Sequence, residues 1–331
     1  MLGVSGIEVS NIGLGTLHYG IYLDESQSIN QVHYALDNGI NFIDTAPLYG
    51  NGSSETILGK ALKGKREQAI VTTKFGLKSS CNNNKFSVDV CSLTDAYIKE
   101  SLNNSLKALK TDYVDLFMVH AFDQSVPQEE ILSTLSKLKD DGKVRAIGCS
   151  NYSPEEIDLT IKVKNRNRNR VASLEAAQVH YNMLERKAEK AFLEKCNNNN
   201  IAVICNRALY RGLLTGKYKN GMELPEKSRA NDSVRIRNLL NDKILLLVKE
   251  LEEYCLLHDK SVSELAIAWL LKKRFVTTVL IGARNKIQLA NCIKARDWNL
   301  TAETVNQVEK IISRYFSEEN LYSNPNVFFE R

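Results

Sequence analysis

Four polar side chains in this sequence come directly after apolar runs, at the points where strands of a folded core would end. Asp44 and Tyr49 follow the run NFI in NFIDTAPLYG, Lys74 lies near the end of AIVTTKF, and His120 ends YVDLFMVH. An isolated buried charge is costly unless an opposite charge pairs with it. We therefore expect Asp44 and Lys74 to form an ion pair at neighbouring strand ends.

These residue types could together protonate a carbonyl oxygen. A phenol, whose pKa is about 10, is a poor acid at neutral pH unless a nearby cation favours its ionised form. Lys74 would be that cation, which predicts a lowered pKa for Tyr49. Tyr49 would then donate a proton to the oxygen of a substrate, and His120 would donate a hydrogen bond to the same oxygen. The hydride must come from a cofactor, because no side chain carries one.

The elements that would bring these residues together are predicted from recurring apolar, β-branched runs. Eight such runs occur, at residues 12–17, 41–46, 69–75, 113–120, 144–150, 174–180, 201–206 and 276–282. Segments with helical spacing separate them, and this alternation indicates parallel strands with crossover helices. Eight units predict an α/β fold, a (β/α)8 TIM barrel, whose active site is built at the C-terminal ends of the strands.

Several segments lie outside the eight repeats. The opening VSGIEVS (residues 4–10) predicts an N-terminal β-hairpin that could plug the bottom of the barrel. The longest interruption, residues 211–238, precedes two helices before strand eight, and a connection of this length usually binds a ligand. Further helices are expected after strand eight, and the tail from Ser313 could fold back over one barrel face. We expect residues 1–331 to form a single domain.

Composition limits the kind of protein that this can be. The chain has 331 residues, of which 43% are hydrophobic and 25% charged, as in soluble globular proteins. No apolar run approaches the roughly 18 residues of a membrane helix, so we expect no membrane association and a cytoplasmic location. The seven cysteines form no C-x-x-C spacing, which argues against a disulfide framework or a metal site. Much of the net charge of +5 lies in residues 162–170, and we expect a solvated helix end there and no nucleic-acid partner.

The motifs, in their order, resemble those of the aldo-keto reductase family over essentially the whole chain. They are GLGT, NFIDTAPLYGNGSSETILGKAL, VTTKFG, VDLFMVHAF, VRAIGCSNYSPEEI, LEAAQVHYNML, RGLLTGKY and LIGARNKIQLAN. The resemblance implies that Asp44, Tyr49, Lys74 and His120 are the catalytic tetrad, with Tyr49 as the general acid when an aldehyde or ketone is reduced. It also implies NADPH as the cofactor, with NADH less expected, and a small-molecule carbonyl compound as the substrate.

The same resemblance implies which residues hold the cofactor. Ser150, Asn151 and Gln178 correspond to contacts of the nicotinamide carboxamide, a group that offers both a donor and an acceptor. The segment RGLLTGKY would lie along the pyrophosphate, and a guanidinium at the start of the helix after LIGA would hold a ribose phosphate. The complete implied set is Gly15, Thr16, Ser150, Asn151, Gln178, Asn206, Arg207, Leu213, Gly216, Lys217, Gly282, Arg284, Gln288 and Asn291.

The chain departs from the family pattern at two places near the expected cofactor. Relatives commonly carry an aromatic residue followed by Ser-Pro where this chain has Asn206 and Arg207 in CNRAL. The usual stacking on the nicotinamide is therefore not expected here, although a guanidinium could cover the ring or meet a phosphate. Cys292 stands where an asparagine often contacts adenine, and Asn291 could replace that contact.

Two other functions are compatible with these residues. The chain could be a cofactor-binding regulatory or partner-binding protein with little turnover, which a complete tetrad disfavours. Alternatively, Lys74 could form a Schiff base as in an aldolase, although pairing with Asp44 would keep that lysine protonated and poorly nucleophilic. The natural substrate, the physiological direction and the oligomeric state cannot be deduced from these motifs.

Overall fold

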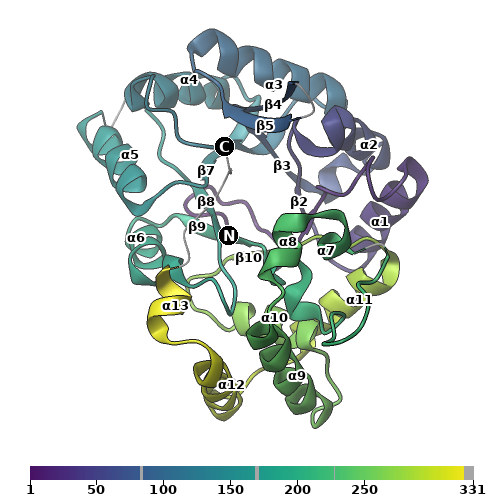
Figure 1. Cartoon of the computed structure of the whole chain (residues 1–331). Coiled ribbons are helices and arrows are strands. Elements are labelled where there is room, and N and C mark those ends of the chain that lie inside the picture. Colours follow the sequence, from purple (N-terminus) through teal and green to yellow (C-terminus); the bar gives the residue numbers. More distant parts are fainter. Residues whose placement is uncertain (83–84, 168–170, 227, 324–331) are drawn as a thin grey trace.

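Eight parallel strands form a closed barrel in the computed structural model, which describes residues 1–82, 85–167, 171–226 and 228–323 (Figure 1). Each strand pairs with the next barrel strand along the chain, and the last pairs with the first. The strands are β1 (Ile12–Gly15), β2 (Phe42–Asp44), β3 (Ile70–Phe75), β6 (Val114–Val119), β7 (Val144–Ser150), β8 (Ala176–His180), β9 (Ala202–Asn206) and β10 (Thr278–Ile281). Every predicted run contains one of them, so the expected (β/α)8 barrel is confirmed.

Helices surround the barrel and start at recognisable caps. Asp24, Ser153 and Ser261 each form a capping box, in which the cap side chain and the residue three positions later bond each other's backbone N–H groups. The helices that cover the first six strands are α1 (Glu25–Asp37), α2 (Ser53–Ala61), α3 (Asp95–Leu109), α4 (Gln128–Asp140), α5 (Pro154–Arg166) and α6 (Phe192–Asn198). Short 3-10 turns lie in the connections between these elements. They are η1 (Tyr49–Gly52), η2 (Arg66–Gln68), η3 (Lys187–Lys190), η4 (Tyr210–Thr215) and η5 (Ala295–Asp297).

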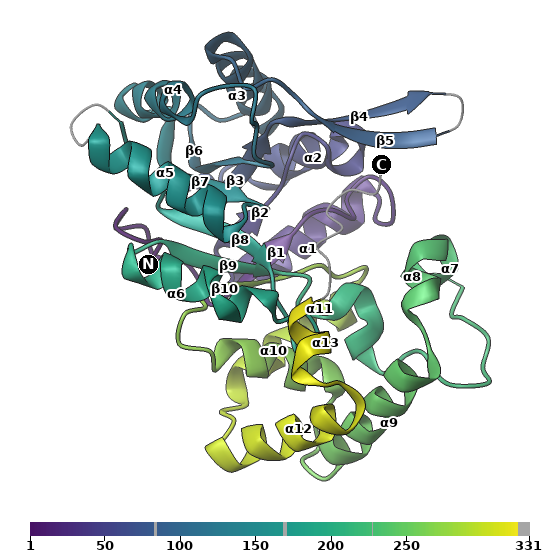
Figure 2. The same ribbon diagram turned by 60° about the vertical axis from the view of Figure 1, so that its left-hand side comes forward.

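The long connection between β9 and β10, described at residues 207–226 and 228–277, carries four helices. They are α7 (Arg229–Asp232), α8 (Val234–Leu239), α9 (Asp242–Leu256) and α10 (Val262–Leu271). Figure 2 shows α7 and α8 on the side of the molecule opposite the N-terminus, set apart from the helices that pack on the barrel wall. The extra helices expected before strand eight are therefore present.

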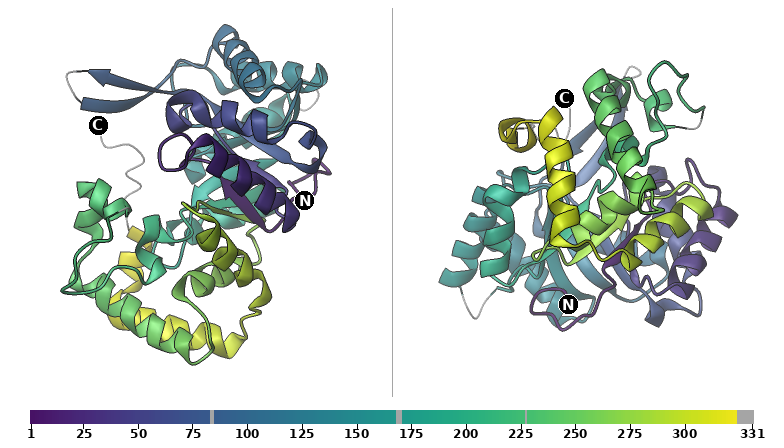
Figure 3. Two further views of the ribbon diagram at one scale, coloured as in Figure 1. Left: turned by 90° about the vertical axis from the view of Figure 1, so that its right-hand side faces the viewer. Right: turned by 90° about the horizontal axis from the view of Figure 1, so that it is seen from below.

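After β10 the chain continues as α11 (Lys286–Lys294), α12 (Ala302–Tyr315) and α13 (Glu318–Ser323). α12 packs against α9 (Figure 3), and α13 packs against η3 through a backbone bond of 2.9 Å from Arg186 N to Leu321 O. The described part of the tail thus covers the segment after β8. Residues 324–331, the rest of the predicted tail, lie outside the described residues.

The first residues close the bottom of the barrel without forming the predicted hairpin strands. A turn brings Leu2 N to 2.8 Å from Ile7 O, and no strand is formed between Met1 and Asn11. Leu2 and Ile7 are nevertheless buried in one cluster with Phe42 and Leu116. Within VSGIEVS, Ile7 therefore contributes to the core, and the segment has too few backbone hydrogen bonds across its turn to form paired strands.

A β-hairpin that the sequence did not reveal follows β3. Its strands β4 (Leu77–Asn82) and β5 (Lys85–Val90) pair antiparallel, with Leu77 opposite Val90. The hairpin extends away from the barrel on the same side as α7 and α8 (Figure 2). The first strand, LKSSCN, is mostly polar and predicts no strand, whereas KFSVDV alternates polar residues with Phe86, Val88 and Val90, a signal that the eight longer apolar runs did not include.

Substitution of Gly59 in α2 tests how closely α2 packs against α3. Alanine is intrinsically better than glycine in a helix by up to about 1 kcal/mol. A Cβ at this position, however, would lie 2.5 Å from Leu109 O, a backbone atom that no rotamer change can move. We expect Gly59→Ala to lower the free energy of unfolding by about 1 to 3 kcal/mol in urea denaturation. Lys60→Ala, on the exposed side of the same helix, is the control, and a stabilised Gly59→Ala protein would contradict the packing described here.

Candidate active site

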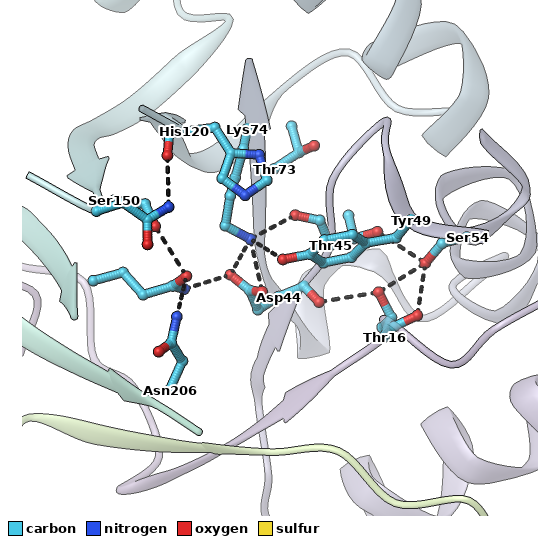
Figure 4. Close-up of polar contacts among 12 residues, drawn as sticks. Thr16, Asp44, Thr45, Tyr49, Ser54, Thr73, Lys74, His120, Ser150 and Asn206 are labelled. Atoms are coloured by element: carbon cyan, nitrogen blue, oxygen red, sulfur yellow. Dashed lines mark hydrogen bonds and ion pairs between the residues drawn. The ribbon is translucent and has the colours of Figure 1, made fainter. Parts of the chain in front are cut away.

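The ion pair predicted from the sequence is formed at the C-terminal ends of β2 and β3. The Lys74 ammonium donates to both carboxylate oxygens of Asp44 at 2.7 Å, to Thr45 O at 2.9 Å and to the Tyr49 hydroxyl at 3.3 Å (Figure 4). Lys74 is fully buried and Asp44 is 3% exposed. A buried charge pair is stable only when its remaining hydrogen-bonding capacity is satisfied, and these four contacts satisfy the ammonium.

The pair and the burial of the site together set how the groups here ionise. Burial lowers the pKa of Lys74, but the Asp44 carboxylate and the Tyr49 phenol outweigh it, so that the pKa lies above its usual value. Burial raises the pKa of Tyr49, and the nearby Lys74 ammonium opposes this shift only in part. The lowered pKa that we predicted for Tyr49 is therefore wrong for this structure, because desolvation of the phenol exceeds the attraction of the cation.

His120 lies beside the same phenol. Its ring centroid is 6.1 Å from that of Tyr49, and the two rings are nearly perpendicular. Burial, with a further contribution from the Lys74 charge, holds the pKa of His120 well below its usual value. The imidazole is therefore neutral at physiological pH and can donate one hydrogen bond without carrying a charge.

The turn that follows β2 fixes the position of Tyr49. Gly50 has φ of 59°, and a Cβ there would lie 2.2 Å from Tyr19 O, so only glycine fits. Ser54 bonds the Thr16 hydroxyl at 2.8 Å and the Thr45 hydroxyl at 3.0 Å, which ties the start of α2 to the ends of β1 and β2. These contacts hold the phenol over the Lys74 ammonium.

A second polar group joins the ends of β7, β8 and β9 to the same carboxylate. The Gln178 side-chain oxygen accepts bonds from Ser150 Oγ at 3.2 Å and Asn206 Nδ2 at 3.1 Å, while its nitrogen donates to Asp44 Oδ1 at 3.0 Å (Figure 4). Asn206 also bonds the His180 imidazole. Asn206 thus provides a polar side chain that orients Gln178.

A cavity of about 590 Å³ extends from the tetrad to the start of α11. Its volume is typical of a site for a small molecule or cofactor. The predicted site residues that line it are Gly15, Asp44, Tyr49, His120, Asn151, Gln178, Asn206, Arg207, Lys217, Gly282, Arg284, Gln288 and Asn291. Residues from distant parts of the sequence therefore meet in one space, as expected.

The other predicted residues lie behind the cavity wall or in the core. Thr16, Lys74 and Ser150 are fully buried and contact residues that line the cavity. Leu213 is 2% exposed and belongs to the hydrophobic core, so a side-chain contact with a cofactor is not supported. Gly216 has φ of 74° and faces Glu252, which indicates that it is needed for the turn.

The far end of the cavity is more basic than the sequence suggested. His18, Arg211 and Arg229 line it beside the predicted Lys217 and Arg284. Burial lowers the pKa of His18 to about 3, and Arg229, Arg284 and Lys217 add to that shift. No local pattern in the sequence marked His18 or Arg229, because they line one cavity only after residues far apart in the sequence are brought together by the fold.

Comparison with known proteins is consistent with this geometry. A model described as the Aldo/keto reductase family matches residues 11–313. The chain belongs to the aldo/keto reductase family. Aldo-keto reductase YhdN of Bacillus subtilis is 38% identical to it, with 95% of this chain and 93% of that protein covered. A putative voltage-gated potassium channel subunit beta of Schizosaccharomyces pombe is 34% identical, with 94% and 92% covered.

A solved structure shares both the fold and the sequence family. The glycerol dehydrogenase AKR11B4 from Gluconobacter oxydans has a TM-score of 0.82 and 32% identity, with 97% of this chain and 94% of that chain covered. This aldo/keto reductase is therefore an NAD(P)H-dependent oxidoreductase built on a (β/α)8 barrel, and its general reaction is carbonyl reduction. Within the described residues, no helix is both long and apolar enough to cross a membrane.

Replacing Lys74 tests the buried pair directly. Lys74→Met leaves the Asp44 carboxylate buried without its cation, and removing one partner of such a pair commonly costs about 3 to 5 kcal/mol. We expect a loss of unfolding free energy of this order and a large loss of activity. Lys99→Met breaks an exposed pair with Asp95 and should change stability by less than about 1 kcal/mol. Equal effects of the two substitutions would show that Lys74 is not held as described.

Proposed function

We propose that this aldo/keto reductase reduces an aldehyde or ketone to an alcohol with NADPH, and that Tyr49 donates the proton. The observation that carries the proposal is the Lys74 ammonium, which bonds Asp44 and Tyr49 at once. A phenol that loses its proton beside an ammonium forms a phenolate stabilised by that charge. Tyr49 is thereby suited to protonate an oxygen that becomes negative during the reaction.

Each other member of the tetrad supports that step. Asp44 keeps Lys74 charged, since its carboxylate raises the pKa of the ammonium. The neutral His120 imidazole donates a hydrogen bond to the substrate oxygen and orients it toward Tyr49. A bound nicotinamide cofactor supplies the hydride. Tyr49 and His120 both line the cavity, which the carbonyl group of a small molecule would enter.

The cavity fits a dinucleotide with phosphate groups. The Nδ1 atom of His18 is buried without a hydrogen-bond partner in the described residues, and cationic side chains surround it. A phosphate at this end would be attracted by Lys217 and Arg229, and Arg284 would bind a 2′-phosphate. At the other end, Asn151 and Gln178 offer amide groups suited to the nicotinamide carboxamide. The whole chain would act as one domain around this cavity.

A regulatory or partner-binding role is the second candidate. The similarity to a putative potassium channel subunit beta favours it, because that name describes a channel component. Steady turnover of a carbonyl compound with NADPH would support the enzyme, whereas tight cofactor binding with negligible turnover on a broad set of aldehydes and ketones would support the alternative. The aldolase role is disfavoured, since the raised pKa of Lys74 leaves little free amine to attack a carbonyl.

Tyr49→Phe separates catalysis from cofactor binding. The substitution removes the proton donor while keeping the ring, so we expect the turnover rate to fall by about 10²- to 10⁴-fold. The dissociation constant for NADPH, measured by fluorescence titration, should stay nearly unchanged. A variant that reduces a good aldehyde substrate at near the native rate would show that another group donates the proton.

Arg284→Ala tests the choice of cofactor. A 2′-phosphate brings about two negative charges, and a guanidinium can bind it through two parallel hydrogen bonds. NADH offers only hydroxyl groups at that position. We expect native protein to bind NADPH more tightly than NADH, and the substitution to weaken NADPH by about tenfold or more and NADH much less. Titration of both nucleotides at one salt concentration measures this, and equal losses would exclude the contact with Arg284.

A further inference from the structure

The arginine assigned to the 2′-phosphate is already held by a carboxylate. Arg284 donates from both terminal nitrogens to Asp232 Oδ2, at 3.4 Å and 3.3 Å. Its guanidinium also lies 3.6 Å above the Tyr22 ring, and its backbone N–H bonds the Gln288 side chain at 2.8 Å. The Arg284 side chain is only 13% exposed. The guanidinium is therefore fixed in place with its donor edge directed at Asp232.

The surroundings of this pair are strongly positive. Arg229 precedes Asp232 by three residues in α7, and burial, then the charges of Arg211 and Arg284, lower the pKa of Arg229. The buried His18 lies near the same guanidinium groups. Because its pKa is low, His18 is neutral, and the cations are Arg211, Arg229 and Arg284. Their mutual repulsion disfavours the cluster unless an anion enters it. Asp232 supplies one negative charge to the cluster from within the chain.

We propose that Asp232 competes with the 2′-phosphate of NADPH for Arg284, and so reduces the preference of this enzyme for NADPH over NADH. The inference rests on the proposed function, in that it places the adenosine end of the cofactor at this end of the cavity. Asp232 accepts from both terminal nitrogens of Arg284, the donors best placed for a bidentate bond to a phosphate, and a carboxylate beside a phosphate repels it. NADPH must displace Asp232, whereas the ribose hydroxyls of NADH leave the ion pair in place.

The segment that carries Asp232 makes this competition possible. Asp232 ends the four-residue helix α7, and its side chain in the ion pair is 31% exposed. α7 belongs to the connection between β9 and β10 and not to the barrel wall (Figure 2). The carboxylate can therefore turn toward solvent when a phosphate takes its place, without disturbing the strands that hold the tetrad.

Asp232→Asn is the test, because asparagine keeps the size of the side chain and removes its charge. The probes are adenosine 2′,5′-bisphosphate and 5′-AMP, which isolate the adenosine end, together with NADPH and NADH, and calorimetry gives each dissociation constant. We expect the 2′-phosphorylated ligands to bind about three- to tenfold more tightly, as breaking a partly exposed ion pair implies. AMP and NADH should change by less than about twofold. Glu223→Gln removes an exposed charge from the same segment and is the control.

A double-substitution cycle locates the effect. In the Arg284→Ala background, Asp232→Asn should no longer favour the 2′-phosphorylated ligands, because the competition requires the guanidinium. An unchanged ratio of 2′-phosphorylated to unphosphorylated affinities would overturn the proposal. An equal loss of affinity for all four ligands would also overturn it, since the ion pair would then act only to hold α7 in position. These ratios of dissociation constants are measured without turnover. A failure of the proposed reductase activity would instead appear as negligible turnover of carbonyl compounds with NADPH.

Discussion

The buried ion pair between Lys74 and Asp44 is the constraint on which the rest of the site depends. Two charges without access to water are stable only if strands β2 and β3 keep a fixed register, in which Asp44 lies opposite Thr72 and Lys74 projects two residues farther along. A closed barrel provides that register, since every strand is paired on both sides. The fold is thus the means by which a charged ammonium is held beneath a phenol.

The same carboxylate connects the two sides of the barrel mouth. Asp44 receives Lys74 from β3 and Gln178 from β8, and Gln178 is oriented in turn by Asn206 from β9. A movement of the Gln178 amide would therefore change the hydrogen bonding of the carboxylate that also holds the Lys74 ammonium. An aromatic residue at position 206 could stack on a ring but could not donate to Gln178. In this chain, position 206 provides a polar link to Gln178.

The sequence predicts those parts of the molecule that repeat or that obey a local rule. The eight strands follow from apolar runs, and the pairing of Asp44 with Lys74 follows from the cost of burying either charge alone. The β4–β5 hairpin was not predicted because β4 is mostly polar, although the alternation of KFSVDV in β5 is a strand signal. The expected N-terminal hairpin is not formed, and Leu2 and Ile7 are buried in the core instead. The raised pKa of Tyr49 could not be predicted either, since it depends on how completely the ring is desolvated.

The basic end of the cavity shows why site chemistry is harder to predict than fold. Arg229 and Asp232 lie within one turn of α7, and one brings a cation toward the cavity while the other brings an anion to Arg284. The Arg229 guanidinium would attract a phosphate and the Asp232 carboxylate would repel it. The net effect depends on how close each side chain lies to Arg284. Because α7 is outside the barrel, substitutions there can change the local charge without disturbing the buried pair at Lys74. The residues proposed to bind the 2′-phosphate and the residue proposed to donate the proton thus lie on separate elements, and only the second group is fixed by a buried charge pair.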